Sequence, residues 1–93
     1  MAGFIQIIEF STSRIDEVQA LAEGMDDMGY ARRANVTADR DRPGTYLNIV
    51  EFDSYDEAMK NSERPEVGEF AGRLAELCDG PPKFYNLDVV TSM

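Results

Sequence analysis

The sequence predicts a single α+β domain in which two helices cover one face of a four-stranded antiparallel sheet. Three short apolar stretches share one layout: FIQIIEF (4–10), YLNIVEF (46–52) and FYNLDVV (84–90). Each opens with an aromatic residue and carries an amide at its third position. Segments with helical spacing of apolar residues follow the first two stretches. With 93 residues, the chain is the size of one domain, expected to span 1–93 with one compact core.

The first half of the chain predicts a strand, a helix and a weaker strand. Residues 3–10 are apolar or alternating and are expected to form the first strand. A helix is expected over about residues 14–28, with its N-cap among Ser11, Thr12 and Ser13. Its apolar positions recur every three or four residues and include Met25 and Met28. Gly29 is expected to end the helix in the left-handed conformation, and 30–38 to form an edge strand.

The second half repeats this pattern after a Pro43–Gly44 turn. Residues 45–52 predict a strand, and Ser54 with Glu57 matches the capping box that starts a helix. That helix is expected to run to about Ser62, with Pro65 opening a further helical segment. Residues 83–91 predict the last strand. The resulting β-α-β-β-α-β order predicts a ferredoxin-like fold with antiparallel strands in the order 4-1-3-2.

Alternation divides the side chains of the predicted strands between two faces. We expect the helices to cover the almost wholly apolar face formed by Ile5, Ile7, Leu47, Ile49, Tyr85, Leu87 and Val89. The other face combines aromatic and aliphatic side chains with amides, and it is expected to be open in a monomer: Phe4, Gln6, Ile8, Phe10, Tyr46, Asn48, Val50, Phe52, Phe84, Asn86, Asp88 and Val90. An exposed apolar face of this kind marks an interaction or ligand site. The sequence therefore predicts a homodimer that pairs sheet to sheet.

The three aligned amides predict a ligand pocket on that second face. Buried amides must be hydrogen-bonded, so Gln6, Asn48 and Asn86 require one another, a facing subunit, water or a ligand as partners. A mostly apolar cavity with a few converging polar groups is the usual small-molecule site. The expected ligand-binding residues are Gln6, Phe4, Asn86, Phe84, Arg33 and Asn35. The last two are included because Ala34 and Val36 are expected to face the helices, and a single bulge would reverse this.

Asp88 is the only acid in this set, which makes it the candidate general base if it is buried. The alternative is that the amides only set strand register or dimer pairing and that Asp88 is solvated at the barrel mouth.

Composition excludes several classes of function. The net charge of −9 repels phosphate backbones and anionic lipids, so neither nucleic acid nor a membrane surface is an expected partner. No apolar run approaches the ~18 residues of a membrane span. The single cysteine forms no intrachain disulfide, which suits a cytoplasmic location. Without histidine the chain cannot build a Ser-His-Asp system, a Cys/His zinc site or a His-ligated haem, and we expect no metal or cofactor.

The element order, the amide-bearing face and the segment EFDSYDEAMKNSERPEVGEF (51–70) resemble the dimeric α/β-barrel superfamily, most closely its antibiotic biosynthesis monooxygenase-like group. The matching features of that segment are an acidic helix start with Ala58, a break with Pro65, and a helix bearing Phe70. The resemblance implies cofactor-free oxygenation of a phenol or quinol, with Asn48 and the neighbouring Tyr46 orienting an acidic aromatic substrate. The chain departs from the group in lacking Trp and the His frequent near the helix break, where Asn61 and Ser62 stand.

Two functional hypotheses follow from the sequence. In the first, the protein binds or oxygenates an aromatic or polyketide-like compound, with Asn48, Tyr46 and Asp88 as the candidate catalytic residues. In the second, it is a non-catalytic dimeric module whose amide-bearing face is only the dimer interface. The sequence leaves open whether the chain is an enzyme.

Overall fold

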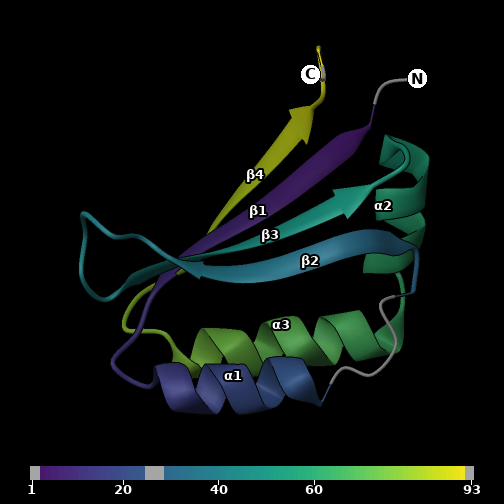
Figure 1. Cartoon of the computed structure of the whole chain (residues 1–93). Coiled ribbons are helices and arrows are strands. Elements are labelled where there is room, and N and C mark those ends of the chain that lie inside the picture. The colour runs from purple at the N-terminus through teal and green to yellow at the C-terminus, as the bar shows by residue number, and fades with distance from the viewer. Residues whose placement is uncertain (1–2, 25–28, 92–93) are drawn as a thin grey trace.

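Four antiparallel strands form the sheet of this protein (Figure 1). The structure is a computed structural model that describes residues 3–24 and 29–91. The strands are β1 (Phe4–Ser11), β2 (Ala31–Ala38), β3 (Thr45–Phe52) and β4 (Lys83–Asp88), in the spatial order β2-β3-β1-β4. All three neighbouring pairs are antiparallel. The predicted fold class and strand order are therefore confirmed.

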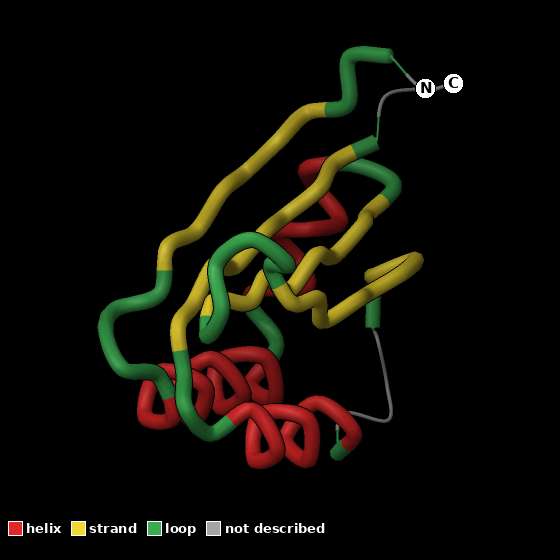
Figure 2. Tube along the Cα trace, turned by 60° about the vertical axis from the view of Figure 1, so that its left-hand side comes forward, coloured by secondary structure: helices red, strands yellow, loops and turns green. Residues whose placement is uncertain are grey.

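Three helices lie on one side of this sheet (Figures 1 and 2). They are α1 (Ile15–Glu23), α2 (Tyr55–Ser62) and α3 (Pro65–Leu77). Helices α1 and α3 lie side by side below the sheet, whereas α2 covers the end where β1 begins and β3 ends. The longest, α3, has 13 residues, and within the described ranges no helix has the length and apolarity needed to span a membrane.

The helix boundaries follow the predicted signals in the second crossover and differ in the first. The Ser54 hydroxyl accepts a hydrogen bond from the Glu57 amide at 3.2 Å, as the capping box predicts, and α3 begins at Pro65. Helix α1 ends at Glu23 and is capped by Gly24. The expected final turn, with Met25 and Met28, lies outside the described residues.

The expected side-chain cap of α1 was wrong, because the N-cap residue is Arg14 and it makes no side-chain cap bond. The Thr12 hydroxyl instead accepts from the Arg14 amide at 2.9 Å and donates to the Leu77 carbonyl at 2.6 Å. Thr12 is only 3% exposed, so this hydroxyl joins the start of α1 to the end of α3 in the interior.

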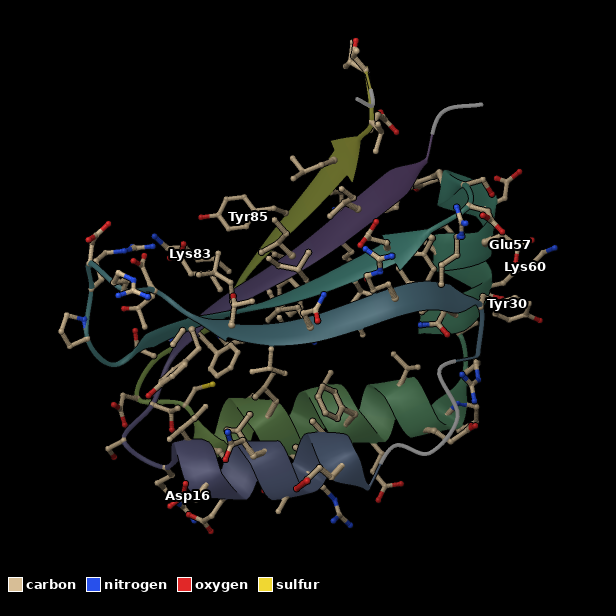
Figure 3. All side chains as sticks on the ribbon, in the orientation of Figure 1. Asp16, Tyr30, Glu57, Lys60, Lys83 and Tyr85 are labelled. Carbon is tan, nitrogen blue, oxygen red and sulfur yellow. The ribbon has the colours of Figure 1, made fainter. Side chains whose placement is uncertain are left out.

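The assignment of the two sheet faces was also wrong. The helices cover the aromatic and amide-bearing face, where Phe4, Phe10 and Phe52 are each no more than 3% exposed. The face expected beneath the helices is open, and its Tyr85 and Leu87 are 39% and 43% exposed. Figure 3 shows Tyr85 and Lys83 on the side of the sheet away from α1 and α3.

The physical reason for this inversion lies in the charges of the strands. Glu9, Glu51 and Lys83 share alternation with the aliphatic positions of the open face. Placing that face beneath the helices would have buried these charged groups, which is costly unless each is paired.

Two separate hydrophobic clusters attach the helices to the sheet. The α2 cluster consists of Phe4, Phe52 and Ala58. The α1–α3 cluster consists of Phe10, Val18 and Leu74, and it lies toward the opposite end of β1. Full burial of a Val or Leu side chain stabilises a fold by roughly 1.5–3 kcal/mol, so each cluster anchors its helix to the sheet. The middle of the sheet, between the clusters, is the region where α3 is held away from the strands.

Candidate functional site

A cavity of about 450 Å³ lies between the sheet and the helices, in the region that separates the two hydrophobic clusters. Five of its lining residues have no side chain larger than a methyl group, and this is why the space stays unfilled: Ala22, Ala31, Ala34, Gly68 and Ala71. Val67 and Phe70 of α3 form the apolar wall of the cavity opposite the strands. The volume falls within the roughly 300–1,000 Å³ typical of small-molecule sites.

Asn48 places an amide at the sheet side of this cavity. It lies on the central strand β3, paired with Ile8 of β1 and Val36 of β2, both of which also line the cavity. The residue is only 9% exposed, and its side chain makes no hydrogen bond with any other part of the chain that the structure describes. Among the described residues no buried side-chain nitrogen or oxygen lacks a partner, so the Asn48 amide is open to the cavity, where a ligand or a bound water can hydrogen-bond to it.

Gln6 supplies a second amide to the same wall. Its Nε2 donates to Oδ1 of Asn86 at 3.1 Å, across the pairing of β1 with β4. Gln6 lines the cavity, while Asn86 is exposed and lies outside it. Asn86 therefore orients Gln6 and does not itself line the cavity.

The cavity reaches both edges of the sheet. Phe84 of β4 lines one end and is 57% exposed, and Val36 of β2 lines the other and is 39% exposed. These partly exposed apolar residues mark the two places where a ligand could enter. Of the residues predicted from the sequence, the structure thus brings Asn48, Gln6 and Phe84 together in one cavity.

Tyr46 and Phe4, predicted as site residues, belong to the core. Tyr46 stacks on Phe10 with ring centroids 5.8 Å apart and packs against the α1–α3 cluster. Phe4 is 3% exposed and packs edge to face with Tyr55, with the ring centroids 5.3 Å apart. Both share the cavity's face of the sheet, but each points into one of the hydrophobic clusters that bound the cavity.

Arg33, Asn35 and Asp88 lie outside the cavity. Ala34 and Val36 face the helices as expected, but because the cavity is on that same side, Arg33 and Asn35 project from the open face. Arg33 pairs there with Glu51 at 3.8 Å. Asp88 ends β4 and is exposed, so the burial that a general base would need there is missing.

Three polar residues at the junction of α2 and α3 line the cavity and were not among the predicted site residues: Asn61, Ser62 and Arg64. The sequence predicts a helix break at these residues. It does not predict that they lie near the sheet, because this depends on the direction in which α3 leaves the break. The sequence signal that could have indicated these three residues is the helix break. Polar side chains at such a junction face either the sheet or the solvent, so each of them was a candidate for the lining. Arg64 is the only charged side chain in the described lining.

Nothing in the described ranges suggests a metal centre. The chain has no histidine, and no group of three or more Asp, Glu or Cys side chains within residues 3–24 and 29–91 could hold an ion. The described lining contains no carboxylate either. The arrangement can therefore bind an apolar ring and offer it amide, hydroxyl and guanidinium groups.

Solved structures share this fold over almost the whole chain. No protein-family model and no curated protein sequence matches it. SnoaB, a cofactor-independent oxygenase from Streptomyces nogalater, superposes with a TM-score of 0.78 at 15% identity, covering 100% of this chain and 98% of its own. A proposed antibiotic biosynthesis monooxygenase from Chloroflexus aurantiacus gives 0.76 at 16% identity, with 98% and 96% covered. Rv0793 from Mycobacterium tuberculosis gives 0.79 at 15% identity, with 97% of each chain covered.

At these identities the likeness establishes a shared fold, and the sequence-based resemblance to antibiotic biosynthesis monooxygenase-like proteins is confirmed at that level. What the chain does must be argued from its own cavity.

Proposed function

We propose that this protein binds a small aromatic compound in the cavity between sheet and helices and oxygenates it with O2 without a cofactor. The observation that carries the proposal is Asn48: an amide 9% exposed, without a side-chain partner among the described residues, in an otherwise mainly apolar cavity of about 450 Å³. The shared fold with SnoaB, a cofactor-independent oxygenase, supports the reaction class. The pocket proposed here is the covered one and not the open face of the sheet.

The chemistry assigned to the cavity needs only the substrate and O2. An ionised phenol or enol delocalises its negative charge onto a ring carbon, which transfers one electron to O2. Recombination of the two radicals forms a carbon–oxygen bond. Loss of the proton on that carbon, with cleavage of the O–O bond, leaves a carbonyl and releases hydroxide, which becomes water by taking up the proton that the substrate lost on ionisation. One oxygen atom thus enters the product, the other leaves as water, and the substrate supplies all four electrons that reduce O2.

Asn48 would act by orientation and charge stabilisation. Its amide N–H can donate to the substrate oxygen, where the negative charge is greatest, in surroundings that exclude most water. Removal of a single preorganised donor of this kind lowers kcat by about 100- to 1,000-fold. The described lining offers no carboxylate as a base, so the substrate would arrive already ionised.

Oxygen consumption with a panel of hydroquinones and naphthols tests this function. We expect uptake by the wild-type protein, and a fall of about 100-fold or more in Asn48→Ala. Asn35→Ala is the matched control, because Asn35 is an exposed amide on the neighbouring strand and projects from the other face. Unchanged uptake in Asn48→Ala would exclude Asn48 as the orienting group. A wild-type protein that binds these compounds but consumes no O2 would favour a binding protein without catalysis.

The open face of the sheet supports a homodimer. It presents Ile5, Ile7, Leu47, Ile49, Tyr85 and Leu87 as neighbours, and the last two are 39% and 43% exposed. Apolar side chains gathered on one face favour association, and a second copy related by a twofold axis is the commonest solution. In this arrangement the dimer interface and the cavity lie on opposite sides of the sheet, so each subunit keeps its own cavity.

Sedimentation velocity tests the dimer. Ile7 lies at the centre of this face, opposite Ile49 and Tyr85, and we expect Ile7→Glu to convert a dimer into a folded monomer. Val90→Glu places the same charge on a valine that is 94% exposed and should leave the dimer intact. A monomeric wild type at micromolar concentration would contradict the proposed assembly.

A further inference from the structure

Arg64 lines the cavity and also a neighbouring pocket whose lining includes Gly29, Lys60 and Glu63. It is the N-cap residue of α3, immediately before Pro65, and its side chain is only 17% exposed. Every other described residue that lines the cavity is uncharged. In a chain with a net charge of −9, the one charged group facing the described part of the cavity is thus a cation.

The fold holds this guanidinium in place from several directions. Nη1 donates to Oδ1 of Asn61 at 3.3 Å, and Nη2 pairs with Glu66 at 2.8 Å. The same Asn61 oxygen accepts a hydrogen bond from the backbone amide of Tyr30 at 3.4 Å. This bond connects the junction of α2 and α3 to the start of β2. The guanidinium is therefore bonded to side chains of α2 and α3, and through Asn61 it is linked to the start of β2.

Gly29 provides the space that Arg64 occupies. Its φ of +62° lies in the left-handed region that favours glycine. A Cβ at this position would also lie 1.7 Å from Nη1 of Arg64, so a side chain would force the guanidinium away. The left-handed backbone of Gly29 and the position of the Arg64 guanidinium thus both favour glycine at position 29.

Guanidinium groups recognise anionic oxygen more effectively than neutral oxygen. Their planar, always charged fork can donate two parallel hydrogen bonds to a carboxylate, and the attraction is stronger where water is partly excluded. No described carboxylate lines the cavity to oppose an incoming anion. Glu66, which pairs with the guanidinium at 2.8 Å, is 57% exposed, and a ligand oxygen would compete with its carboxylate.

We propose that Arg64 forms the anion-binding subsite of the cavity and that the cavity selects aromatic compounds carrying a carboxylate or phenolate oxygen. The inference rests on the proposed function, because it takes the cavity as the ligand site. It adds the charge of the ligand and the residue that recognises it. Arg64 is a binding and positioning residue in this account, and Asn48 remains the group nearest the reacting ring.

Calorimetry with two probes of nearly identical shape tests the subsite. The probes are 2-naphthoate, which is anionic at neutral pH, and 2-naphthamide, which is neutral. We expect the wild-type protein to bind 2-naphthoate at least about 10-fold more tightly, because hydrogen bonds to charged groups are the stronger class. In Arg64→Met, affinity for 2-naphthoate should fall by about 10- to 100-fold while that for 2-naphthamide changes by less than about twofold.

Arg73→Met is the matched control for this experiment. Arg73 belongs to the same helix and pairs with Glu69 at 2.9 Å on the surface, with a side chain 63% exposed. Its substitution removes the same charge without touching the cavity, so affinity for both probes should stay at the wild-type value. An equal loss of 2-naphthoate binding in Arg73→Met would show that net charge alone is responsible and would overturn the proposal.

A second variant covers the case in which Arg64→Met does not fold. Glu66→Gln removes a carboxylate that shares the guanidinium, so we expect 2-naphthoate to bind about threefold more tightly and 2-naphthamide to be unaffected. Unchanged 2-naphthoate affinity in Glu66→Gln would contradict the subsite. Equal wild-type affinity for the two probes would overturn the subsite and leave the aromatic cavity standing. Binding of neither probe would contradict both this inference and the proposed function.

Discussion

Asn48 shows how one residue on a central strand can be left available for binding. The residue is 9% exposed and its side chain makes no hydrogen bond in the described chain, yet no buried polar atom there lacks a partner, so its amide is open to the cavity. The amides of Gln6 and Asn86, at the equivalent strand positions, bond to each other at 3.1 Å. The three amides that look alike in the sequence therefore differ: Gln6 and Asn48 line the cavity, whereas Asn86 lies outside it and bonds to Gln6.

Cys78 lies close to the interior but differs from Asn48 in having no access to the cavity. The thiol packs against the α1–α3 cluster, and burial raises its pKa, with the negative charge of Asp79 adding to the effect. A raised pKa leaves less thiolate at a given pH, and the thiolate is the nucleophile. We expect iodoacetamide at pH 8 to modify Cys78 slowly in the native protein and rapidly in urea, as followed by intact mass. Equal rates in the two states would contradict this account of Cys78.

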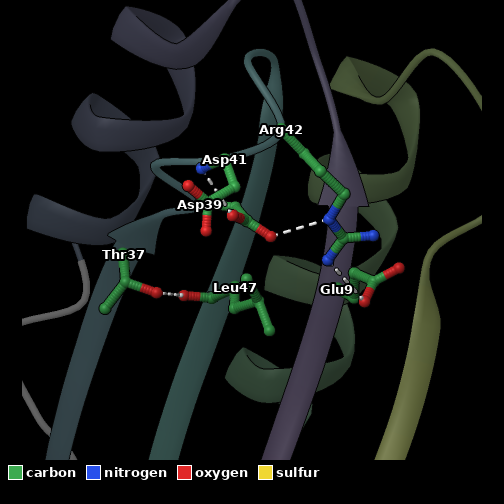
Figure 4. A network of polar contacts seen from close by, with 6 residues as sticks. All are labelled: Glu9, Thr37, Asp39, Asp41, Arg42 and Leu47. Atoms are coloured by element: carbon green, nitrogen blue, oxygen red, sulfur yellow. Dashed lines mark hydrogen bonds and ion pairs between the residues drawn. The ribbon is translucent and has the colours of Figure 1, made fainter.

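At the scale of elements, the β2–β3 hairpin is held by charges. The Arg42 guanidinium donates to Asp39 at 2.7 Å and to Glu9 of β1 at 3.4 Å, as Figure 4 shows. The Asp41 amide also donates to Asp39, at 3.0 Å. The hydrogen bond from Arg42 is the main cause of a lowered pKa of Asp39, followed by that from the Asp41 backbone.

This network predicts a stability difference that depends on pH. Because the pKa of Asp39 is lowered by folding from its ordinary value of 3.8, its contribution to stability is complete above that value and is lost as the pH falls through the folded-state pKa. We expect Arg42→Met to be less stable than the wild type in urea titrations at pH 6, and the difference to shrink below pH 3.8. Arg40→Met is the control, since Arg40 makes no ion pair with a described residue of the same molecule. A difference that stayed constant down to pH 3 would contradict the role of Asp39.

Element boundaries were largely predictable because local chemistry determines them. Thr45–Phe52 and Tyr55–Ser62 agree with the expected ranges, and both are bounded by strong signals: Pro43–Gly44, and Ser54 with Glu57. The N-cap of α1 was not predictable in this way, because the Thr12 hydroxyl bonds to Leu77, 65 positions along the chain. A local pattern cannot anticipate a contact with a distant helix end.

Which face of the sheet the helices cover was harder to predict, because this too depends on contacts between distant parts of the chain. Alternation correctly separates Ile7 and Ile49 from Gln6 and Asn48, but two largely apolar faces give no preference by hydrophobicity alone. The charges of Glu9 and Glu51 were the available signal, and they favour exposure of the aliphatic face. The cavity residues Asn61 and Arg64 depended on that choice, so assigning the wrong face to the helices also left these two residues out of the predicted site.

At the scale of the whole molecule, the cavity follows from how the core is divided. The α2 cluster and the α1–α3 cluster support opposite ends of the sheet, and small side chains face one another between them. Dense packing is the rule in protein interiors, whereas this space of about 450 Å³ is left partly open between the sheet and the helices. A fold that kept this space only for stability would be better served by larger side chains.

Filling the cavity should therefore raise stability and lower binding together. Ala71 of α3 lines the cavity, and Ala71→Leu would place an isobutyl group inside it. We expect the free energy of unfolding to rise by on the order of 1 kcal/mol, from newly buried apolar surface, while affinity for 2-naphthol falls at least about 10-fold. Urea denaturation and calorimetry measure the two quantities on the same preparation.

Ala75→Leu separates the effect of the cavity from that of the helix. Ala75 lies one turn further along α3, is exposed and does not line the cavity, so its substitution changes helix propensity in the same way without entering the space. We expect 2-naphthol to bind Ala75→Leu as it binds the wild type. If Ala71→Leu bound 2-naphthol undiminished, the ligand would have to lie elsewhere, and the cavity would be a packing defect between two clusters. If Ala71→Leu lowered both the affinity for 2-naphthol and the free energy of unfolding, the space would be too small for a leucine side chain. The cavity would then not be an open ligand site.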